Sequence, residues 1–428
     1  MLLRLPFAAP VPLSWLEALF TATSAVCVTG LTVVDTGTRF SPAGQAVILG
    51  LIQLGGLGIM TYAVFVALLL GRDVSFTDRR VIQDSLHHSP NPELARLVRY
   101  MLLFTFTVEG LGAAALWLRF HQKLGPGEAA WLGVFHSVSA FCNAGFSLWA
   151  DSLVRWRGDV LVNVVVSLLI LLGGLGFLVN LELRQQAGLA LRRRRRPRLS
   201  LHTRLVLVVT LLLLATGSVA FLWLEWGNLL RGLSPGERLL ASWFQAVTPR
   251  TAGFNTVDYS KAAPATLFVT VILMMIGASP GSTGGGVKTT TLGLIAALLA
   301  ARWRGRGRAT VFRRTIPHAV MDRALTLLLL AVVFVSLGTG LLLVTEGHSV
   351  PFEEAHPRFV ALVFEAVSAF ATVGLSTGVT PSLSAAGKMV LVVLMFVGRV
   401  GPLTLVLAVG PGPQRGRFRY AEENVMVG

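Results

Sequence analysis

The chain has 428 residues, of which 54% are hydrophobic and 14% are charged. Soluble proteins carry about 25% charged residues, so this composition excludes an ordinary soluble domain. The net charge of +16 would suit a nucleic-acid-binding protein. No aromatic or RNA-binding motif accompanies the arginines, however, and we expect no nucleic-acid partner.

Long apolar runs predict the main elements. Runs of about 18 or more apolar residues are typical of membrane-spanning helices. Taken in chain order, seven spans are expected, at approximately residues 43–70, 95–119, 159–183, 203–226, 264–300, 318–345 and 387–410. The sequence therefore predicts an all-α polytopic protein that crosses the plasma membrane several times and contacts membrane lipid.

Arginines cluster in alternate connections between these spans. They concentrate in segments 71–100, 184–204 and 301–318, with the run Arg192–Arg196 in the second, and again after residue 411. Cytoplasmic loops carry an excess of Arg and Lys, so these segments are predicted to be cytoplasmic and the other connections external. The two cysteines, Cys27 and Cys142, have neither metal-binding spacing nor the number that a disulfide framework needs.

Four short, polar, Gly-rich segments resemble one another. Each begins with Phe, continues with small residues and reaches a Gly followed by a large apolar residue; they cover residues 20–35, 135–151, 244–258 and 364–379. A second Gly follows each loop Gly by 24 to 28 residues, at Gly55, Gly173, Gly277 and Gly398. The repetition predicts four tandem units, each a span, a pore helix, a Gly-containing loop and a span, around a central pore.

The repeats divide the chain into residues 1–92, 93–200, 201–316 and 317–411, followed by a cytoplasmic tail, 412–428. Four units require eight spans, whereas seven are found. We therefore expect the first outer span to be missing, and we interpret this as a truncated or mis-assigned start.

The loops have the composition that a cation filter needs. A K⁺ filter replaces the hydration shell of the ion with rings of backbone carbonyl oxygens, and Gly reaches the required backbone conformations without steric cost. Pore helices would also point their partly negative C-terminal ends toward the ion. The candidate filter residues are Val28, Thr29, Gly30, Asn143, Ala144, Gly145, Thr251, Ala252, Gly253, Thr372, Val373 and Gly374.

Glycines in membrane helices often serve close packing instead. This alternative suits Gly55, Gly56, Gly173 and Gly174 better than the loop glycines, since packing glycines need not follow a polar loop four times.

Residues 277–288 interrupt the span 264–300. They include one Pro and five Gly, which cost about 3 and about 1 kcal/mol each in a helix relative to Ala. The span is therefore expected to be broken, and the break must line a cavity. The same stretch nearly matches an ATP-binding Walker A motif, but Val287 separates Gly286 from Lys288 and no βαβ unit surrounds it.

The loop motifs, together with residues 50–62 and 276–291, resemble the KtrB/TrkH/HKT superfamily of potassium transporters, and KtrB most closely. The resemblance covers about residues 12–410. It implies potassium uptake, a selectivity filter lined by the four loop glycines, and a location in the bacterial inner membrane. It also implies a homodimer with one pore per subunit, and a cytoplasmic KtrA/TrkA-like regulatory ring. The nucleotide would bind that ring, so we expect no cofactor on this chain, only K⁺ as the transported ion. Some sodium-preferring plant relatives have Ser in the first loop, so the four glycines favour K⁺ over Na⁺.

The resemblance also assigns a gate below the filter. Its residues would be Arg399, as an electrostatic barrier to cations, and the broken stretch with Gly277, Ser279, Pro280, Gly281, Gly284, Gly285, Gly286 and Lys288. A charge at the bilayer centre is costly and must face a pore or a partner. From the sequence alone, Arg399 could therefore equally form a buried ion pair.

Four other ionisable residues are expected at membrane depth. Glu17 and Glu365 are predicted near the starts of pore helices, where a carboxylate complements the helix dipole. Glu109 is predicted to pair with a basic group, which the sequence does not identify. Arg250 precedes Gly253 by three residues and is predicted to brace the loop behind the filter.

Two other classes of protein are less consistent with the sequence. Secondary transporters also have broken helices and repeats, but their repeats are usually two and often inverted. An intramembrane enzyme would need a catalytic motif, and the sequence contains neither His-Glu-x-x-His nor Gly-x-Ser-x-Gly.

Overall fold

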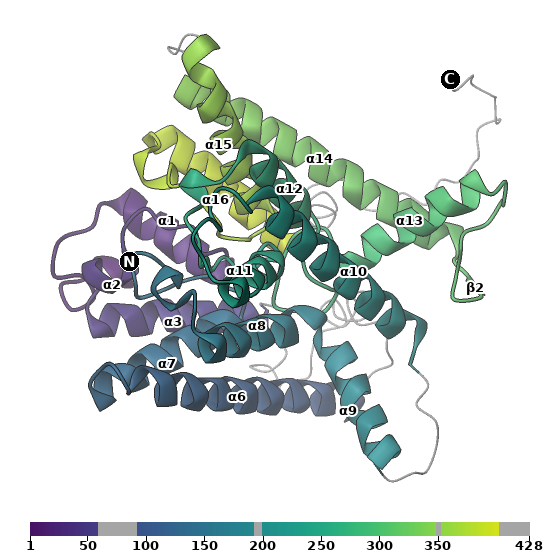
Figure 1. Cartoon of the computed structure of the whole chain (residues 1–428), viewed down its shortest axis with the longest axis horizontal. Helices are drawn as coiled ribbons and strands as arrows, with labels where there is room; N and C mark the ends of the chain where they lie inside the picture. Colours follow the sequence, from purple (N-terminus) through teal and green to yellow (C-terminus); the bar gives the residue numbers. More distant parts are fainter. Residues whose placement is uncertain (59–91, 192–198, 348–351, 402–428) are drawn as a thin grey trace.

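The computed structural model describes residues 1–58, 92–191, 199–347 and 352–401, and most of these residues lie in helices (Figure 1). Five predicted features lie wholly or partly outside the described residues: the second half of span 43–70, most of segment 71–100, the run Arg192–Arg196, the end of span 387–410 and the tail 412–428. A small hairpin of β1 (Thr310–Val311) and β2 (Arg314–Thr315) is an exception to the all-α expectation.

Each Gly-containing loop follows a short helix, which we call the pore helix. The four pore helices are α1 (Trp15–Val26), α7 (Pro126–Phe141), α11 (Pro235–Val247) and α15 (Phe352–Phe370). The Phe that opens each repeated segment is fully buried in its pore helix, at Phe20, Phe135, Phe244 and Phe364. Burial of these large rings anchors the pore helices in the core.

Three long helices precede pore helices, and we call them the outer helices: α6 (Pro92–Phe120), α10 (Leu201–Leu224) and α14 (His318–Gly347). Each packs against its own pore helix, α6 on α7, α10 on α11 and α14 on α15. Within the described residues, these three contain the segments that are long and apolar enough to cross a membrane as single helices.

The inner helices follow the loops and close the molecule into a ring. They are α3 (Pro42–Leu57), α8 (Val160–Leu175), α12 (Pro264–Met275) and α16 (Ala385–Val400). Each inner helix contacts the pore helix of the next unit: α3 meets α7, α8 meets α11, α12 meets α15, and α16 returns to α1. Short elements complete the chain: η1 (Leu2–Arg4), α2 (Thr36–Arg39), η2 (Val154–Trp156), η3 (Tyr259–Lys261) and η4 (Thr380–Ser382).

The predicted span 159–183 is not one straight helix. The chain bends by 105° between α8 and α9 (Phe177–Leu191), at Gly176, whose φ is 92°. This left-handed conformation interrupts an α-helix and is tolerated by Gly. Two other inner helices end in the same way, α3 at Gly58 (φ 82°) and α16 at Gly401 (φ 92°). The span 264–300 is interrupted as expected, between α12 and α13 (Thr289–Trp303).

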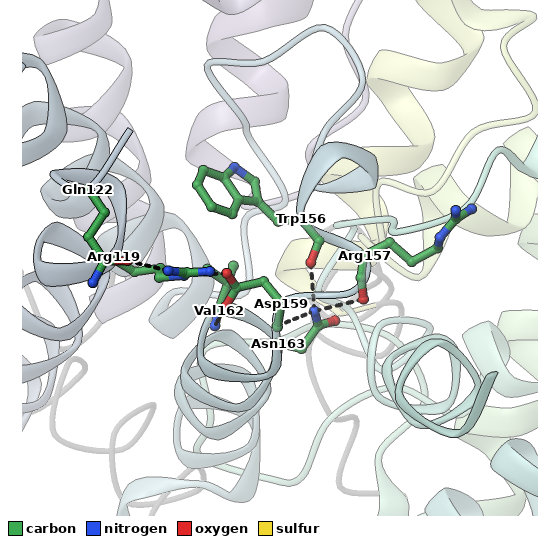
Figure 2. A network of polar contacts seen from close by, with 7 residues as sticks. All are labelled: Arg119, Gln122, Trp156, Arg157, Asp159, Val162 and Asn163. Atoms are coloured by element: carbon green, nitrogen blue, oxygen red, sulfur yellow. Dashed lines mark hydrogen bonds and ion pairs between the residues drawn. The ribbon is translucent and has the colours of Figure 1, made fainter. Parts of the chain in front are cut away.

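The end of each outer helix is tied to the start of the inner helix in the same unit. Figure 2 shows the second unit, where Arg119 pairs with Asp159, the N-cap of α8, which also accepts a hydrogen bond from Val162 N at 3.1 Å. In the third and fourth units, a carboxylate at the end of the outer helix makes the connection. Glu225 accepts a hydrogen bond from Ala263 N at 2.8 Å, and Glu346 accepts one from Ser384 N at 3.1 Å.

The first unit has a different tie. The N-cap of α3, Ser41, donates its backbone N–H to Ala8 O at 3.0 Å, and its hydroxyl donates to Phe7 O. The segment around Phe7 and Ala8 therefore occupies the position that the end of an outer helix holds elsewhere.

Two parts of the chain extend from the same side of the bundle. In Figure 1, α9, α13 and the β1–β2 hairpin project toward the right. The α13–hairpin segment contains the arginine-rich residues 301–318. This common side is where the charge pattern predicts the cytoplasm.

Candidate functional site

The four loops share a strained backbone conformation. Two residues before each loop Gly, a non-Gly residue adopts a positive φ: Val28 (56°), Asn143 (59°), Thr251 (63°) and Thr372 (50°). The loop glycines do the same: Gly30 (94°), Gly145 (68°), Gly253 (78°) and Gly374 (90°). Left-handed φ values in non-Gly residues are uncommon and persist where the surroundings hold them. Their recurrence at one position of four loops therefore indicates a shared functional requirement.

The loop glycines meet one another in a ring. A Cβ atom added to Gly145 would lie 2.8 Å from Ala252 O, and one added to Gly253 would lie 2.5 Å from Val373 O. Added to Gly374 it would collide with Thr29 O, and added to Gly30 it would collide with Ala144 O. Each unit thus abuts the next, and the fourth abuts the first. A backbone carbonyl oxygen of every loop therefore lies beside the glycine of the neighbouring loop.

The side chains of the loops are withdrawn from solvent. The six residues Val28, Thr29, Asn143, Ala144, Thr251 and Thr372 are all 0% exposed. The pore helices α1, α7 and α15 end two residues before Val28, Asn143 and Thr372, respectively. Their C-terminal carbonyl groups therefore add partial negative charge beside the ring. A ring of carbonyl oxygens with such surroundings can coordinate a dehydrated monovalent cation.

Hydroxyl groups at the ends of the pore helices support the loops. Ser24 Oγ and Ser368 Oγ accept hydrogen bonds from the backbone N–H of Gly30 and Gly374, both at 3.1 Å. Ser139 Oγ donates to Phe146 O at 2.8 Å, and Thr248 Oγ1 donates to Phe254 O. These residues were not among the predicted site residues, although a Ser or Thr stands five or six residues before the loop Gly in all four segments.

The broken stretch forms a loop beneath the ring, and we call residues 276–288 the gate loop. Its two ends pair through a bridge between Ile276 and Val287, with Gly277 N donating to Val287 O at 2.8 Å. A Cβ added to Gly284 would collide with Thr251 Oγ1, and one added to Gly285 with Thr372 Oγ1. This loop is therefore in direct contact with Thr251 and Thr372, the first predicted filter residues of the third and fourth loops.

The gate loop is also bound to the bend between α8 and α9. Ser279 N donates to Gly174 O at 3.0 Å, and Thr283 N donates to Gly173 O at 3.2 Å. In return, Phe177 N donates to Gly281 O at 3.0 Å. These bonds satisfy carbonyl groups that the end of α8 leaves free, so the helix bend and the loop stabilise each other.

Two basic side chains hold the gate loop. Lys288 Nζ donates to Gly284 O at 2.8 Å. Arg399, on α16, donates to Thr283 O in the gate loop and to Gly55 O at the end of α3. Among the described residues Arg399 forms no ion pair, so the ion-pair alternative is not what the structure contains. Its guanidinium instead connects the gate loop to two inner helices.

The second set of glycines divides into two groups. A Cβ added to Gly55, Gly173 or Gly398 would collide with the last carbonyl of the adjacent pore helix, at Val26, Phe141 or Phe370. The packing interpretation is therefore confirmed for Gly55 and Gly173, and the structure extends it to Gly398. Gly277 differs, because it lies beyond the end of α12 in the gate loop, and an added Cβ would collide with Gly285 O. Its equivalence to the other three is wrong because the third inner helix ends before it.

The predictions for the two glutamates of the pore helices have different outcomes. Glu17 lies in the first turn of α1, in a capping box with Ser14, as expected. Glu365 lies in the last third of α15, not near its start, and its carboxylate accepts hydrogen bonds from the loop that leaves the filter. The start of α15 was misjudged because the helix begins at Phe352, well before the repeated segment.

The other two ionisable residues form no ion pair in the described part of the chain. Glu109 is buried, and its carboxylate accepts a hydrogen bond from Cys142 Sγ at 3.7 Å; no ion pair of Glu109 occurs in the described part of the chain. Arg250 is also buried, and its Nε has no hydrogen-bond partner there. Its bracing role stays a prediction. No cluster of three or more His, Cys, Asp or Glu side chains in the described residues could hold a metal ion.

Comparisons with known proteins were made for the whole chain. The family model described as a cation transport protein, TrkH, matches residues 3–415. The chain is 41% identical to the Ktr system potassium uptake protein B of Bacillus subtilis, over 100% of this chain and 93% of that protein. It is 40% identical to the potassium/sodium uptake protein NtpJ of Enterococcus hirae, with the same coverage. Among solved structures, it resembles the potassium transporter TrkH from Vibrio parahaemolyticus with a TM-score of 0.71 and 20% identity, over 94% of this chain and 79% of that one.

Proposed function

Because the chain belongs to the TrkH family of cation transport proteins, we propose that it is the ion-translocating subunit of a potassium uptake system. Membership confirms the resemblance expected from the loop motifs, and the expectations of a multi-pass membrane protein and of a transporter rather than an enzyme. What remains to be argued is which ion is carried, by which residues, and how the pathway is closed.

The ring of four loop glycines is the observation that carries this proposal. It supports a filter in which carbonyl oxygens of residues 28–30, 143–145, 251–253 and 372–374 replace the water around K⁺. Any side chain on Gly374 would collide with Thr29 O across the ring, so the ring accepts only glycine there. A filter of this kind discriminates by the geometry and field of its carbonyl groups.

The gate loop would close the pathway below the filter. Its contacts with Thr251 and Thr372 support this role, because an ion that leaves the filter on that side meets the loop first. Arg399 supplies a positive charge beside the same loop and holds it by a hydrogen bond to Thr283 O. Opening then requires the loop to leave the filter, which breaks the bonds to Gly173, Gly174 and Arg399.

The proposal includes partners that this chain does not itself contain. The likeness to a Ktr system protein B supports assembly as a homodimer on a cytoplasmic ring of KtrA/TrkA-like subunits. Nucleotide would bind that ring, and this chain would carry no cofactor. The arginine-rich segment of α13 and the β1–β2 hairpin lies on the side where such a ring would dock.

Ion flux into liposomes tests the function. The purified protein, alone and with a cytoplasmic ring, would be reconstituted and the uptake of K⁺, Rb⁺ and Na⁺ compared. We expect K⁺ and Rb⁺ uptake well above that of Na⁺. If no monovalent cation entered, even with the ring added and the chain extended at its start, the proposal would be wrong. Saturating flux with counterflow would indicate a carrier with alternating access instead of a pore.

A further inference from the structure

Three of the four pore helices send one polar side chain across to the loop that leaves the filter. His136 Nε2 is 3.0 Å from Ser147 Oγ, and Gln245 Nε2 donates to Thr256 Oγ1 at 2.9 Å. In the fourth unit the residue is Glu365. These three side chains are buried, and they stand eight or nine residues before the filter glycine of their own loop. We call them the outer braces, because they hold the segment that follows the filter.

Glu365 makes the most extensive of these contacts. Its Oε1 accepts from Ser376 Oγ at 2.7 Å and from Thr377 N at 2.9 Å, and its Oε2 accepts from Thr380 Oγ1 at 2.6 Å. The Thr377 hydroxyl also donates to Oε1 at 3.2 Å. Four donors thus converge on one fully buried carboxylate. An ionised carboxylate only accepts and can accept about four hydrogen bonds, so this arrangement fills it.

The first unit lacks the contact. Thr21 occupies the place nine residues before Gly30, and its buried hydroxyl has no hydrogen-bond partner among the described residues. The fourth and first units are also neighbours in the ring, since Gly374 abuts Thr29 O. The strongest outer brace therefore stands beside the unit that has none.

We propose that Glu365 is a positioning residue that sets ion selectivity, by locking residues 376–380 and thereby fixing Gly374 against the unbraced first loop. This inference rests on the proposed potassium function. Filter residues in left-handed conformations hold their geometry only where the surrounding structure over-determines it. Hydrogen bonds to a charged acceptor are about twice as strong as neutral ones, so Glu365 contributes most to that constraint. A loosened ring would admit an ion of different size.

Glu365→Gln is the direct test, because it keeps the size of the side chain but turns an amide donor toward groups that are themselves donors. We expect K⁺ uptake to persist while the K⁺/Na⁺ uptake ratio falls by about tenfold. Thr380→Val removes one donor with little change of shape and should lower the ratio less. Combined with Glu365→Gln, it should cause little further loss, because both changes break the same bond.

Glu225→Gln is the matched control. Glu225 is equally buried and its carboxylate accepts from Ala263 N at 2.8 Å, Asn228 Nδ2 at 2.7 Å and Leu229 N at 3.2 Å, where the end of the outer helix α10 meets the start of the inner helix α12. It should lower the melting temperature and leave the ratio at the wild-type value.

The outcomes separate the two proposals. Selective wild-type flux with an unchanged ratio in folded Glu365→Gln and Thr380→Val proteins would overturn the role of Glu365 alone. An equal fall of the ratio in Glu225→Gln would also overturn it, since the effect would then be general destabilisation. Absence of wild-type cation flux would instead contradict the proposed function.

Discussion

At the scale of single residues, the filter loops concentrate backbone strain. Val28, Asn143, Thr251 and Thr372 each hold a left-handed conformation that costs about 1–3 kcal/mol. Such a cost is tolerated where neighbouring groups fix the chain, and hydroxyl groups of the pore helices supply part of that constraint. Selectivity should therefore depend on side chains that never touch the ion.

Ser368→Ala tests the hydroxyl support. The change leaves the buried N–H of Gly374 without its partner at 3.1 Å, which should cost about 1–3 kcal/mol of stability. We expect a lower melting temperature in detergent together with a lower K⁺/Na⁺ uptake ratio. Ser382→Ala is the control, because that exposed hydroxyl donates to Val379 O, away from the ring. Equal effects of the two changes would refute the support by Ser368.

Arg399→Gln tests the latch on the gate loop. Glutamine has no positive charge and is too short to reach both Thr283 O and Gly55 O as the guanidinium does. Loss of about 1.4 kcal/mol from the barrier would raise basal K⁺ uptake about tenfold. Lys388→Gln, which removes a cation near the start of the same helix, should leave uptake unchanged. Unaltered or reduced basal uptake in Arg399→Gln would argue against a latch.

Residue types alone indicated much of the site. The repeated Phe and Gly identified the segments that the structure brings together. Each Phe places a large aromatic ring in the core, and each Gly adopts a positive φ that other residues rarely adopt. The contacts of Glu365, Gln245 and His136 could not be foreseen, because they depend on where the chain turns after the filter. From the sequence alone, Arg399 could face a pore or form a buried ion pair. Its carbonyl acceptors could not be predicted, because any residue type has a backbone carbonyl group.

At the scale of elements, the bend after α8 and the gate loop form one unit. The bend leaves carbonyl groups free at Gly173 and Gly174, and backbone N–H groups of the gate loop occupy them. The apolar run predicted a span here but not its bend, because hydropathy does not register a single residue of positive φ. The interruption of span 264–300 was predictable, because Pro and several Gly together disfavour a helix.

Gly285→Ala tests the contact between the gate loop and the filter. The added methyl group would collide with Thr372 Oγ1 and should displace the loop from the filter. We expect higher basal K⁺ uptake with an unchanged K⁺/Na⁺ ratio. Gly50→Ala on the inner helix α3 is the control, because nothing lies within 4 Å of the added atom. Lower uptake in Gly285→Ala than in the control would show that the loop does not close the pathway there.

The tie between α6 and α8 predicts a difference between two aspartates (Figure 2). Asp159→Ala removes the N-cap of α8 and the partner of Arg119, and should lower stability by about 0.5–2 kcal/mol. Asp151→Ala breaks only an exposed pair with Arg155 and should cost about 0–1 kcal/mol. Thermal unfolding in detergent measures both. A larger loss in Asp151→Ala would contradict the structural importance of this tie.

At the scale of the whole molecule, four units close into a ring although the chain supplies only three described outer helices. Contact between α16 and α1 completes the ring of helices, and contact between Gly374 and Thr29 completes the ring of loops. The repeats in the sequence predicted four units, and the described residues contain four pore helices, each in contact with the inner helix of a neighbouring unit. The exact boundaries of the units stay predictions, as do the homodimer and the cytoplasmic ring, because they depend on surfaces outside one chain.

The central claim is that the four loop glycines form the selectivity filter, and one pair of variants tests it most directly. Gly374 (φ 90°) and Gly232 (φ 80°) both have a left-handed φ, but a side chain would collide with Thr29 O at the first and meets open space at the second, in the connection between α10 and α11. Gly374→Ser and Gly232→Ser would be reconstituted and their K⁺, Rb⁺ and Na⁺ uptake compared with wild type. We predict that Gly374→Ser loses K⁺ selectivity while Gly232→Ser keeps it. Equal selectivity of the two folded variants would contradict the assignment of the filter.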